Sequence, residues 1–256
     1  MLRRLIPSTL ATAAIAAALV AGPPQARPDS TKAAPRSGGS VRAEGSVTRG
    51  DLFSAVTFAD SAFGREWSRL RPEAQVRYPG LVLTDAADLH ITVVYIGAGW
   101  KPEDLDRIRA HALVVPAVPI HLTPEVVPLG RNNHVVAVEL HHTPTVWADS
   151  VVAAKDALNR LGLKKPEGYD TNFRSHVTLA RAGHSPPTPA DSTELAGFLS
   201  WMTSKIAEDP RKFTVTVGPT TRVLLLLAGV PRPEGAPEYV TVEDFLEQQR
   251  TSRPGK

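Results

Sequence analysis

The sequence predicts an α+β fold in which helices cover the outside of a mixed sheet. Predicted strands and helices occur in both halves of the chain, and several strands follow one another as hairpins rather than in strict alternation with helices. The 256 residues, 42% of them hydrophobic, are enough to bury a sizeable core. The absence of cysteine excludes disulfide scaffolds, thiol nucleophiles and cysteine metal sites.

Runs of apolar and β-branched residues between Gly or Pro turns predict the strands, and apolar residues at helical spacing predict the helices. Pro102, followed by two acids, opens one helix, and Gly162 ends another. In chain order the predicted elements are a strand at 55–58, a helix at 61–75, strands at 80–84 and 89–96, a helix at 101–113, strands at 118–127 and 135–140, a helix at 146–161, a strand at 175–180, a helix at 193–207, and strands at 213–217, 222–227 and 239–242.

The first fifty residues are predicted to lie outside the folded domain. A basic start precedes an uncharged, Ala-rich run at 10–22, which is too short to cross a bilayer and is typical of a signal peptide. We expect residues 1–26 to be a signal or targeting peptide for export to the periplasm or the medium, with an organellar transit peptide as the alternative. Residues 27–50 are predicted to be a disordered linker, followed by the domain at 51–248 and a flexible tail at 249–256.

The distribution of charge argues against a long nucleic acid as the partner. The isoelectric point is about 9.3, but residues 1–50 hold seven Lys or Arg and only two acids. The remaining chain has 22 basic and 24 acidic residues, a net charge of −2. A nearly neutral domain does not fit many phosphate contacts and favours a small substrate.

Four of the eight histidines stand in a His-x-Thr pattern, and histidine is the side chain best suited to proton transfer near pH 7. At 121–123 and 141–143 a proline follows the Thr, so Pro124 and Pro144 are expected to end their strands, with His121 and His141 at strand ends. The other two copies, at 90–92 and 176–178, lie within the apolar strands LHITVVYI and SHVTLA.

These two copies predict a shared cleft. Residues i and i+2 of a strand project from the same face, so each copy presents an imidazole beside a hydroxyl. A single copy would more often be a core histidine with a β-forming threonine. Two matched copies on apolar strands need partners for their polar groups, because unpartnered polar groups are costly to bury.

The two strands resemble those of the 2H phosphoesterase superfamily, which includes 2′-5′ RNA ligase-like proteins and 2′,3′-cyclic nucleotide phosphodiesterases. The similarity rests on LHITVVYIG at 89–97 and SHVTLAR at 175–181, and it extends to the order of elements from about 51 to 245. It implies a bilobal α+β fold with two pseudo-symmetric mixed or antiparallel sheet lobes, outer helices and a central cleft. Carried over by residue, the catalytic set is His90, Thr92, His176 and Thr178.

The pattern suits metal-independent hydrolysis of a 2′,3′-cyclic phosphate, or a related 2′-5′ phosphodiester, of a nucleotide or short RNA end. One neutral imidazole would take a proton from water and the other would protonate the departing ribose oxygen. The two threonine hydroxyls would donate hydrogen bonds to phosphate oxygens. No cofactor is expected, and the sequence leaves open which histidine is the base.

Three further residues are candidate substrate contacts. Arg181 lies where the family motif often ends in Arg, and either phosphate binding or strand-end packing fits it. Tyr169 and Phe173 precede the second motif, where an aromatic ring stacks on a base or packs in the core. Tyr95 and Arg181 fall an odd number of residues after their histidines, so unbroken strands would point them away from the cleft. His134, His184, Lys164 and Lys165 are expected at the surface.

Two other functions stay open at this point. One is a nucleotide- or oligonucleotide-binding protein that uses the same cleft without turnover. The other is an exported metal-binding protein that uses the same histidines, although His-Thr pairs without nearby acids make a poor metal shell. We expect a monomer without a stable membrane anchor.

Overall fold

The computed structural model describes residues 50–251 apart from 131–132, 142–144, 169 and 231–235. The predicted targeting peptide at 1–26 and residues 27–49 of the predicted linker lie outside this range, as do residues 252–256 of the predicted tail. Within the described range, no helix combines the length and apolar character needed to span a membrane.

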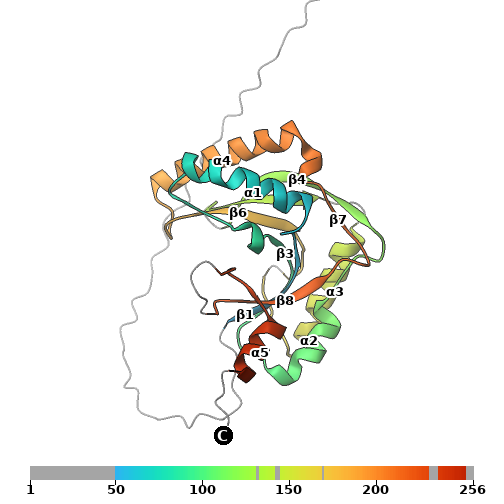
Figure 1. Cartoon of the computed structure of the whole chain (residues 1–256). Coiled ribbons are helices and arrows are strands. Elements are labelled where there is room, and N and C mark those ends of the chain that lie inside the picture. Colours follow the sequence, from blue (N-terminus) through green and yellow to red (C-terminus); the bar gives the residue numbers. More distant parts are fainter. Residues whose placement is uncertain (1–49, 131–132, 142–144, 169, 231–235, 252–256) are drawn as a thin grey trace, which may run out of the picture. The chain divides into compact units, whose positions relative to one another are not determined.

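In the described residues, nine strands form one sheet in the order β7-β4-β5-β6-β3-β1-β8-β9, and β2 pairs with β6 (Figure 1). Every recorded strand pair is antiparallel. The predicted α+β class is therefore confirmed, with an antiparallel rather than a mixed sheet. The strands are β1 (Asp51–Thr57), β2 (Leu81–Leu83), β3 (His90–Gly97), β4 (Ile120–Leu129), β5 (Val135–His141), β6 (His176–Ala182), β7 (Val215–Val217), β8 (Val223–Ala228) and β9 (Val240–Thr241).

Helices cover one face of this sheet. The helices of the described chain are α1 (Ala62–Arg77), α2 (Leu105–Ala112), α3 (Val146–Arg160), α4 (Pro189–Glu208) and α5 (Val242–Thr251). Helices α1 and α4 lie side by side over the half that contains β6 and β4, whereas α2, α3 and α5 lie over the other half (Figure 1). The sheet is thus formed by two halves, β4-β5-β6 and β3-β1-β8, which meet between β6 and β3.

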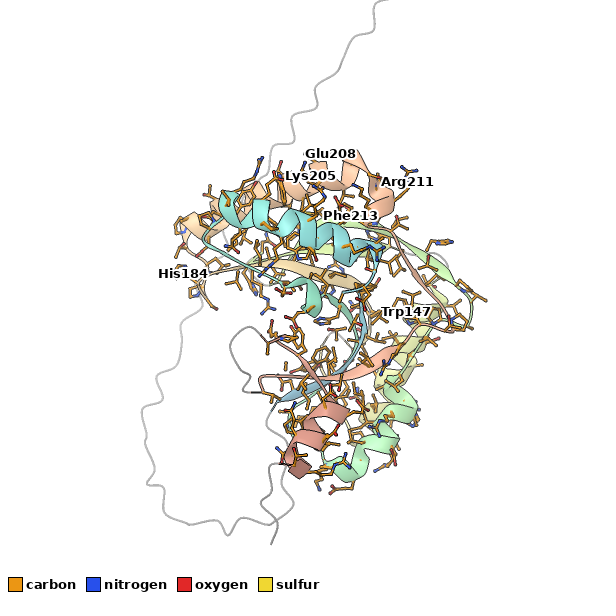
Figure 2. All side chains as sticks on the ribbon, viewed as in Figure 1. Trp147, His184, Lys205, Glu208, Arg211 and Phe213 are labelled. Atoms are coloured by element: carbon orange, nitrogen blue, oxygen red, sulfur yellow. The ribbon has the colours of Figure 1, made fainter. Side chains whose placement is uncertain are left out.

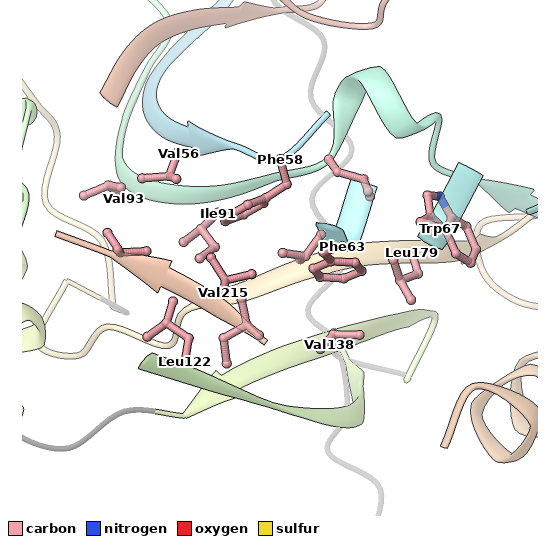
Figure 3. Close-up of a cluster of buried hydrophobic side chains, with 14 of the residues drawn as sticks. Val56, Phe58, Phe63, Trp67, Ile91, Val93, Leu122, Val138, Leu179 and Val215 are labelled. Carbon is pink, nitrogen blue, oxygen red and sulfur yellow. The ribbon is translucent and has the colours of Figure 1, made fainter. Parts of the chain in front are cut away.

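A single core fills the space between the helices and the sheet. All five helices contribute buried side chains to the cluster that also contains the inward residues of the strands. Figure 3 shows part of it, where Phe63 and Trp67 from α1 approach Ile91, Val138 and Leu179 from three strands. Fully burying a large apolar side chain contributes roughly 1.5–3 kcal/mol, so this cluster stabilises the fold.

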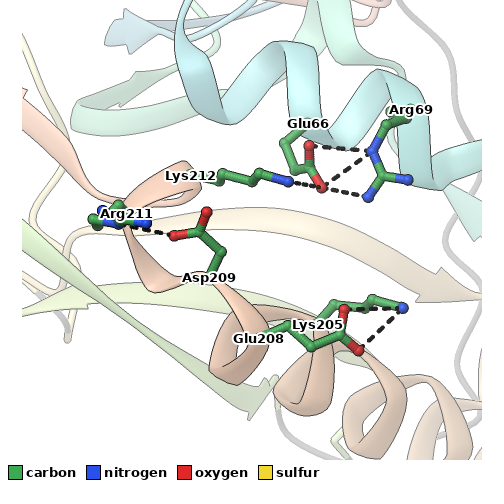
Figure 4. Close-up of polar contacts among 7 residues, drawn as sticks. All are labelled: Glu66, Arg69, Lys205, Glu208, Asp209, Arg211 and Lys212. Carbon is green, nitrogen blue, oxygen red and sulfur yellow. Dashed lines mark hydrogen bonds and ion pairs between the residues drawn. The ribbon is translucent and has the colours of Figure 1, made fainter.

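Surface ion pairs on α1 and α4 contribute little by comparison. Glu66 on α1 accepts from Arg69 and from Lys212 in the turn after α4, while Lys205 pairs with Glu208 (Figure 4). Exposed pairs of this kind are typically worth less than about 1 kcal/mol.

Two helices differ from the sequence prediction because of their caps. Helix α4 begins at Pro189 rather than at 193, because Thr188 and Asp191 form a capping box. Helix α5 was not predicted: the expected strand at 239–242 ends at Thr241, where the Asp244 N–H donates to the Thr241 hydroxyl oxygen at 3.1 Å. Each missed boundary follows from a local hydrogen bond between a threonine and an acid three residues later.

The prediction that Pro124 ends a strand was wrong. Strand β4 continues to Leu129, and Pro124 pairs with Leu140 of β5. On the other side of β4, the recorded pairing with β7 covers only Ile120 to Leu122 of β4. Pro124 therefore lies where β4 is an edge, and an edge strand tolerates a residue that cannot donate a hydrogen bond.

Candidate active site

The two His-x-Thr motifs lie side by side where the two halves of the sheet meet. The recorded pair between β3 and β6 is Ile91 with Val177, the central residue of each motif. Antiparallel register then places His90 opposite Thr178, and Thr92 opposite His176, on one face. Directly opposite residues have Cβ atoms about 4.5–5.5 Å apart, and diagonal neighbours such as the two histidines are about 7–8 Å apart. The shared cleft predicted from the motifs thus has a structural basis.

Both imidazoles are anchored by the same kind of hydrogen bond, from Nδ1 to a backbone carbonyl oxygen. His90 Nδ1 lies 2.7 Å from the Asp88 carbonyl oxygen, and His176 Nδ1 lies 2.9 Å from the Arg174 carbonyl oxygen. A carbonyl oxygen only accepts, so Nδ1 is the protonated nitrogen in each ring. The Nε2 atoms are left to accept or donate a proton toward the cleft.

A bulge follows each motif at the same position. Strand β1 pairs Ala55 with Thr92 and Ser54 with Val94, so Val93 is an extra residue. Strand β5 likewise pairs Ala137 with Thr178 and Val136 with Ala180, so Leu179 is extra. Both extra side chains are buried in the core (Figure 3). A bulge changes which later residues share a face.

The bulges correct the predicted orientation of Tyr95 and Arg181. Unbroken strands would point both side chains away from the cleft, but one extra residue returns them to the face of Thr92 and Thr178. Arg181 lines a cavity with His90, and Tyr95 lines a cavity with His176. The pseudo-symmetry implied by the motifs therefore extends five residues beyond each histidine.

Replacing Ser54 with alanine is expected to cost about 1–3 kcal/mol of unfolding free energy. Ser54 is fully buried, and its hydroxyl oxygen accepts the Val94 N–H at 3.1 Å beside the first bulge. The Ser54→Ala variant leaves that amide unsatisfied, which costs its desolvation. Urea unfolding measures the loss. Ser150→Ala, at an exposed hydroxyl on α3, is the control and should change stability by less than about 0.5 kcal/mol. Equal stability of the two variants would contradict this role of Ser54.

Two adjoining cavities meet at Thr92. One, of about 250 Å³, is lined by His90, Thr92, Thr178 and Arg181, among others. The other, of about 240 Å³, is lined by Thr92, Tyr95, Lys155, Phe173, Arg174 and His176, among others. We call them the His90 cavity and the His176 cavity. Neither imidazole is sealed in the core, since both rings are half-buried and border a cavity.

Aromatic rings surround His90. The ring centroids of Phe53 and Tyr239 lie 5.2 and 4.8 Å from that of His90. Burial lowers the pKa of His90 below its ordinary value of 6.5, the hydrogen bond to the Asp88 carbonyl acts in the opposite direction, and the nearby His176 lowers it again. Burial also raises the pKa of Tyr239 to about 12, so its hydroxyl is neutral. The surroundings of His90 therefore favour the neutral form of its ring.

Charged groups surround His176. Glu139 on β5 is its register partner, and the Arg174 guanidinium donates to both Glu139 oxygens, from Nε to Oε1 at 2.8 Å and from Nη2 to Oε2. The hydrogen bond from Arg174 is the main reason that the pKa of Glu139 is lowered. The two halves of the site therefore match in backbone geometry and differ in polarity.

Buried ion pairs hold the loop that precedes His176. Lys164 was predicted to lie in a solvated turn, but it is buried and donates to Asp170 at 2.9 Å and to Glu167 at 3.1 Å. The spacing of these residues gave no sign of the pairing, because it depends on the path of the loop. Lys155 on α3 donates to the Asn172 carbonyl at 2.9 Å. Both lysines therefore anchor the loop beside the His176 cavity.

The remaining candidates have different outcomes. The Phe173 ring borders the His176 cavity and also packs edge-on against Trp147 at 5.0 Å, so it combines the two roles considered for it. Tyr169 lies outside the described residues. His184 is at the surface as predicted, beside the start of α4 (Figure 2), and its side chain is 69% exposed. Among the described residues, no group of three or more His, Asp or Glu could hold a metal ion.

Sequence reasoning missed Asp88, Glu139, Lys155 and Tyr239. Tyr239, which packs against His90, lies 149 residues after it in the sequence. Glu139 lies beside His176 because strands β5 and β6 pair. Only Asp88 is near a motif in sequence, and its role at His90 is played by its backbone carbonyl. No pattern of residue types could have identified that contact.

Comparison with known proteins identifies the fold. No protein-family model and no curated protein matches the chain. Among the solved structures that match are E. coli LigT in its apo form, with 16% identity over 75% of this chain and 94% of that chain and a TM-score of 0.50, and a structure described as a phosphoesterase, with 16% identity over 75% and 95% and a TM-score of 0.51. The chain therefore has a LigT-like phosphoesterase fold. The predicted resemblance to 2H phosphoesterases is confirmed for the fold.

Proposed function

We propose that the protein is a metal-independent phosphodiesterase that hydrolyses a 2′,3′-cyclic phosphate, or a related 2′-5′ phosphodiester, of a nucleotide or short RNA end. The observation that carries this proposal is the paired arrangement of His90 and His176. Each ring is anchored through Nδ1 to a carbonyl oxygen, each leaves Nε2 toward a cavity, and each faces a threonine hydroxyl across the β3–β6 junction. In-line hydrolysis needs a base and an acid on opposite sides of a phosphate.

The reaction uses the two rings in one step. The base Nε2 takes a proton from water as the water oxygen bonds to phosphorus. The P–O bond to the ribose oxygen breaks, and the acid Nε2 gives that oxygen its proton. Thr92 and Thr178 donate hydrogen bonds to non-bridging oxygens, which carry the negative charge of the transition state. Arg181 adds a fixed positive charge beside them.

The size and lining of the cavities favour a small substrate. Each cavity has room for part of a nucleotide, and Tyr95 and Phe173 offer aromatic surfaces for a base in the His176 cavity. A protein that binds a nucleotide without turnover is the second candidate, because the same contacts would hold the phosphate. Turnover distinguishes the two.

The test is hydrolysis of the four 2′,3′-cyclic mononucleotides by the full chain, with and without EDTA. We expect conversion to a nucleoside monophosphate that EDTA does not reduce, and a conversion at least about 100-fold slower by a His90→Ala, His176→Ala double variant. Nucleotide binding without conversion would favour the binding protein. Activity abolished by EDTA and restored by a metal would refute metal-independent hydrolysis.

Replacing Arg181 with glutamine is expected to raise KM about tenfold with a smaller change in kcat. Arg181 borders the His90 cavity and forms an ion pair with Glu238, with 3.2 Å between Nη2 and Oε2. A guanidinium in this place can bind phosphate but does not transfer protons. Steady-state kinetics on the best cyclic substrate measure the change. Arg211→Gln is the matched control, because Arg211 is 91% exposed and pairs only with Asp209 among the recorded ion pairs of the described chain. An unchanged KM for Arg181→Gln would contradict phosphate binding by this residue.

A further inference from the structure

A third cavity adjoins the His90 cavity and has no part in the proton transfers described above. It has a volume of about 290 Å³, and we call it the Leu226 cavity. Asp88, His90 and Tyr239 line both cavities, so these three residues form the boundary between them. A substrate whose phosphate lies beside His90 can therefore extend past this boundary into the Leu226 cavity.

One wall of the Leu226 cavity is apolar. Leu224 and Leu226 of β8 line it, and both belong to a small hydrophobic cluster that is separate from the main core. Leu225, which stands between them, belongs to the main core, so the alternation of strand side chains puts the two lining leucines on the other face of the sheet. His90 lies on that same face, because its ring packs against Phe53 of the small cluster. Such a surface suits a flat group with apolar faces, such as a nucleobase.

A buried carboxylate, that of Asp88, also lines the Leu226 cavity. Asp88 is only 8% exposed, whereas Asp244, the other acid of the lining, is exposed and accepts from the Thr241 hydroxyl at 2.7 Å. Among the described residues, the hydrogen bond recorded for the Asp88 carboxylate comes from the Tyr239 N–H at 3.4 Å, and no recorded ion pair includes it. A carboxylate accepts through two oxygens, so Asp88 has acceptor capacity left for a ligand. Because a carboxylate repels phosphate, that capacity serves another part of the substrate.

We propose that the Leu226 cavity is a nucleobase subsite and that the Asp88 carboxylate makes it selective for guanine. This inference rests on the proposed hydrolysis. Guanine presents two adjacent donors, N1–H and the 2-amino group, so both oxygens of one carboxylate can accept from it. Adenine, cytosine and uracil each place an acceptor beside the donor on that edge, and an acceptor is repelled by the carboxylate. In the His176 cavity, by contrast, the lining carboxylate is that of Asp170, which is paired with Lys164.

The test compares kcat/KM for guanosine and inosine 2′,3′-cyclic phosphates, which differ only in the 2-amino group of the nucleobase. In wild type we expect guanosine to be preferred about tenfold or more, the usual effect of a hydrogen bond to a charged group. Asp88→Asn keeps an acceptor for the Tyr239 N–H but replaces the second carboxylate oxygen with a donor, so the preference should fall at least about fivefold. Asp85→Asn is the matched control, because Asp85 lies in the same turn, has a side chain that is 54% exposed and lines none of the three cavities.

A guanosine preference that Asp88→Asn reduces and Asp85→Asn retains supports the inference. Equal rates on the two substrates in wild type, or a preference that survives Asp88→Asn, would overturn it. If Asp88→Asn does not fold, Leu224→Phe decides, because the added ring narrows the cavity: a KM for the guanosine substrate raised about fivefold or more supports a nucleobase there, and an unchanged KM overturns it. Failure of the proposed function looks different, since neither cyclic phosphate would then be hydrolysed, and this inference would fall with it.

Discussion

Replacing His176 with alanine is expected to lower kcat/KM for a 2′,3′-cyclic mononucleotide by about 10²–10⁴-fold, the usual contribution of a positioned proton-transfer group. Replacing His90 with alanine should cause a loss of similar size. The double variant should be little worse than either single variant, because residues that act in one step do not contribute additively. Steady-state kinetics measure all three effects. Far-UV circular dichroism and the melting temperature show whether the variants remain folded.

The two single variants should differ when the leaving group needs no proton. Thymidine 5′-(4-nitrophenyl phosphate) releases 4-nitrophenolate, which departs without an acid. On this substrate the loss caused by replacing the histidine that acts as the acid should be at least about tenfold smaller than on the cyclic substrate. The loss caused by replacing the base should stay the same, because the water still needs a base. The variant that the nitrophenyl substrate rescues therefore identifies the acid, and equal losses of both variants on the two substrates would contradict proton donation by either ring.

The pH profile adds a directional expectation for His90. Burial, together with the neighbouring His176, lowers the pKa of His90 below its ordinary value. The limb of the rate profile that reports His90 should therefore lie at a lower pH than an ordinary histidine would give. Phe53→Ala, which removes an aromatic ring that packs against His90, should move that limb upward. A limb that moves downward in this variant would contradict burial as the cause.

The central pair of motifs was predictable because strand geometry is local. His-x-Thr places two polar side chains on one face whatever the rest of the fold does. The bulges also leave a trace in the sequence. In a regular half-buried strand a single apolar residue stands between two polar ones, but here two apolar residues follow one another, Val93-Val94 and Leu179-Ala180. Only the assumption of unbroken strands points Tyr95 and Arg181 away from the cleft.

The surroundings of each ring were not predictable, because they come from distant parts of the chain. Tyr239 belongs to the segment before β9, and Glu139 is placed opposite His176 by the β5–β6 register. Neither belongs to a local motif. Sequence alone could therefore identify two equivalent imidazoles, whereas their different surroundings depend on tertiary packing.

The loop before β6 provides the second large effect. Replacing Asp170 with asparagine is expected to lower the unfolding free energy by about 3–5 kcal/mol, because the Lys164 ammonium then stays buried without its main partner. Glu167, which lies 3.1 Å from the same ammonium, compensates in part, so the lower end of this range is expected. Urea unfolding measures the loss. Lys205→Met, at the partly exposed pair with Glu208 (Figure 4), is the control and should cost less than about 1 kcal/mol.

The same variant has an expected pH dependence. Burial acts to raise the pKa of Asp170, but hydrogen bonds from Lys164, Asn159 and the Glu167 N–H outweigh it and lower that pKa below 3.8. A depressed folded pKa gives stability that is present above the unfolded value and is lost as the pH falls through the folded value. The stability difference between wild type and Asp170→Asn should therefore be constant near pH 6 and shrink below about pH 4. A difference that grows in acid would contradict the pairing.

The consequence for activity follows from where the loop leads. Asp170 stands just before Asn172, Phe173 and Arg174, which line the His176 cavity. Arg174 also holds the His176 ring through its carbonyl. Asp170→Asn should therefore raise KM and lower kcat at a temperature where the variant is still folded, although Asp170 takes no part in proton transfer. Ser54→Ala also destabilises the fold but acts beside the first bulge, so at matched stability it should raise KM less than Asp170→Asn does.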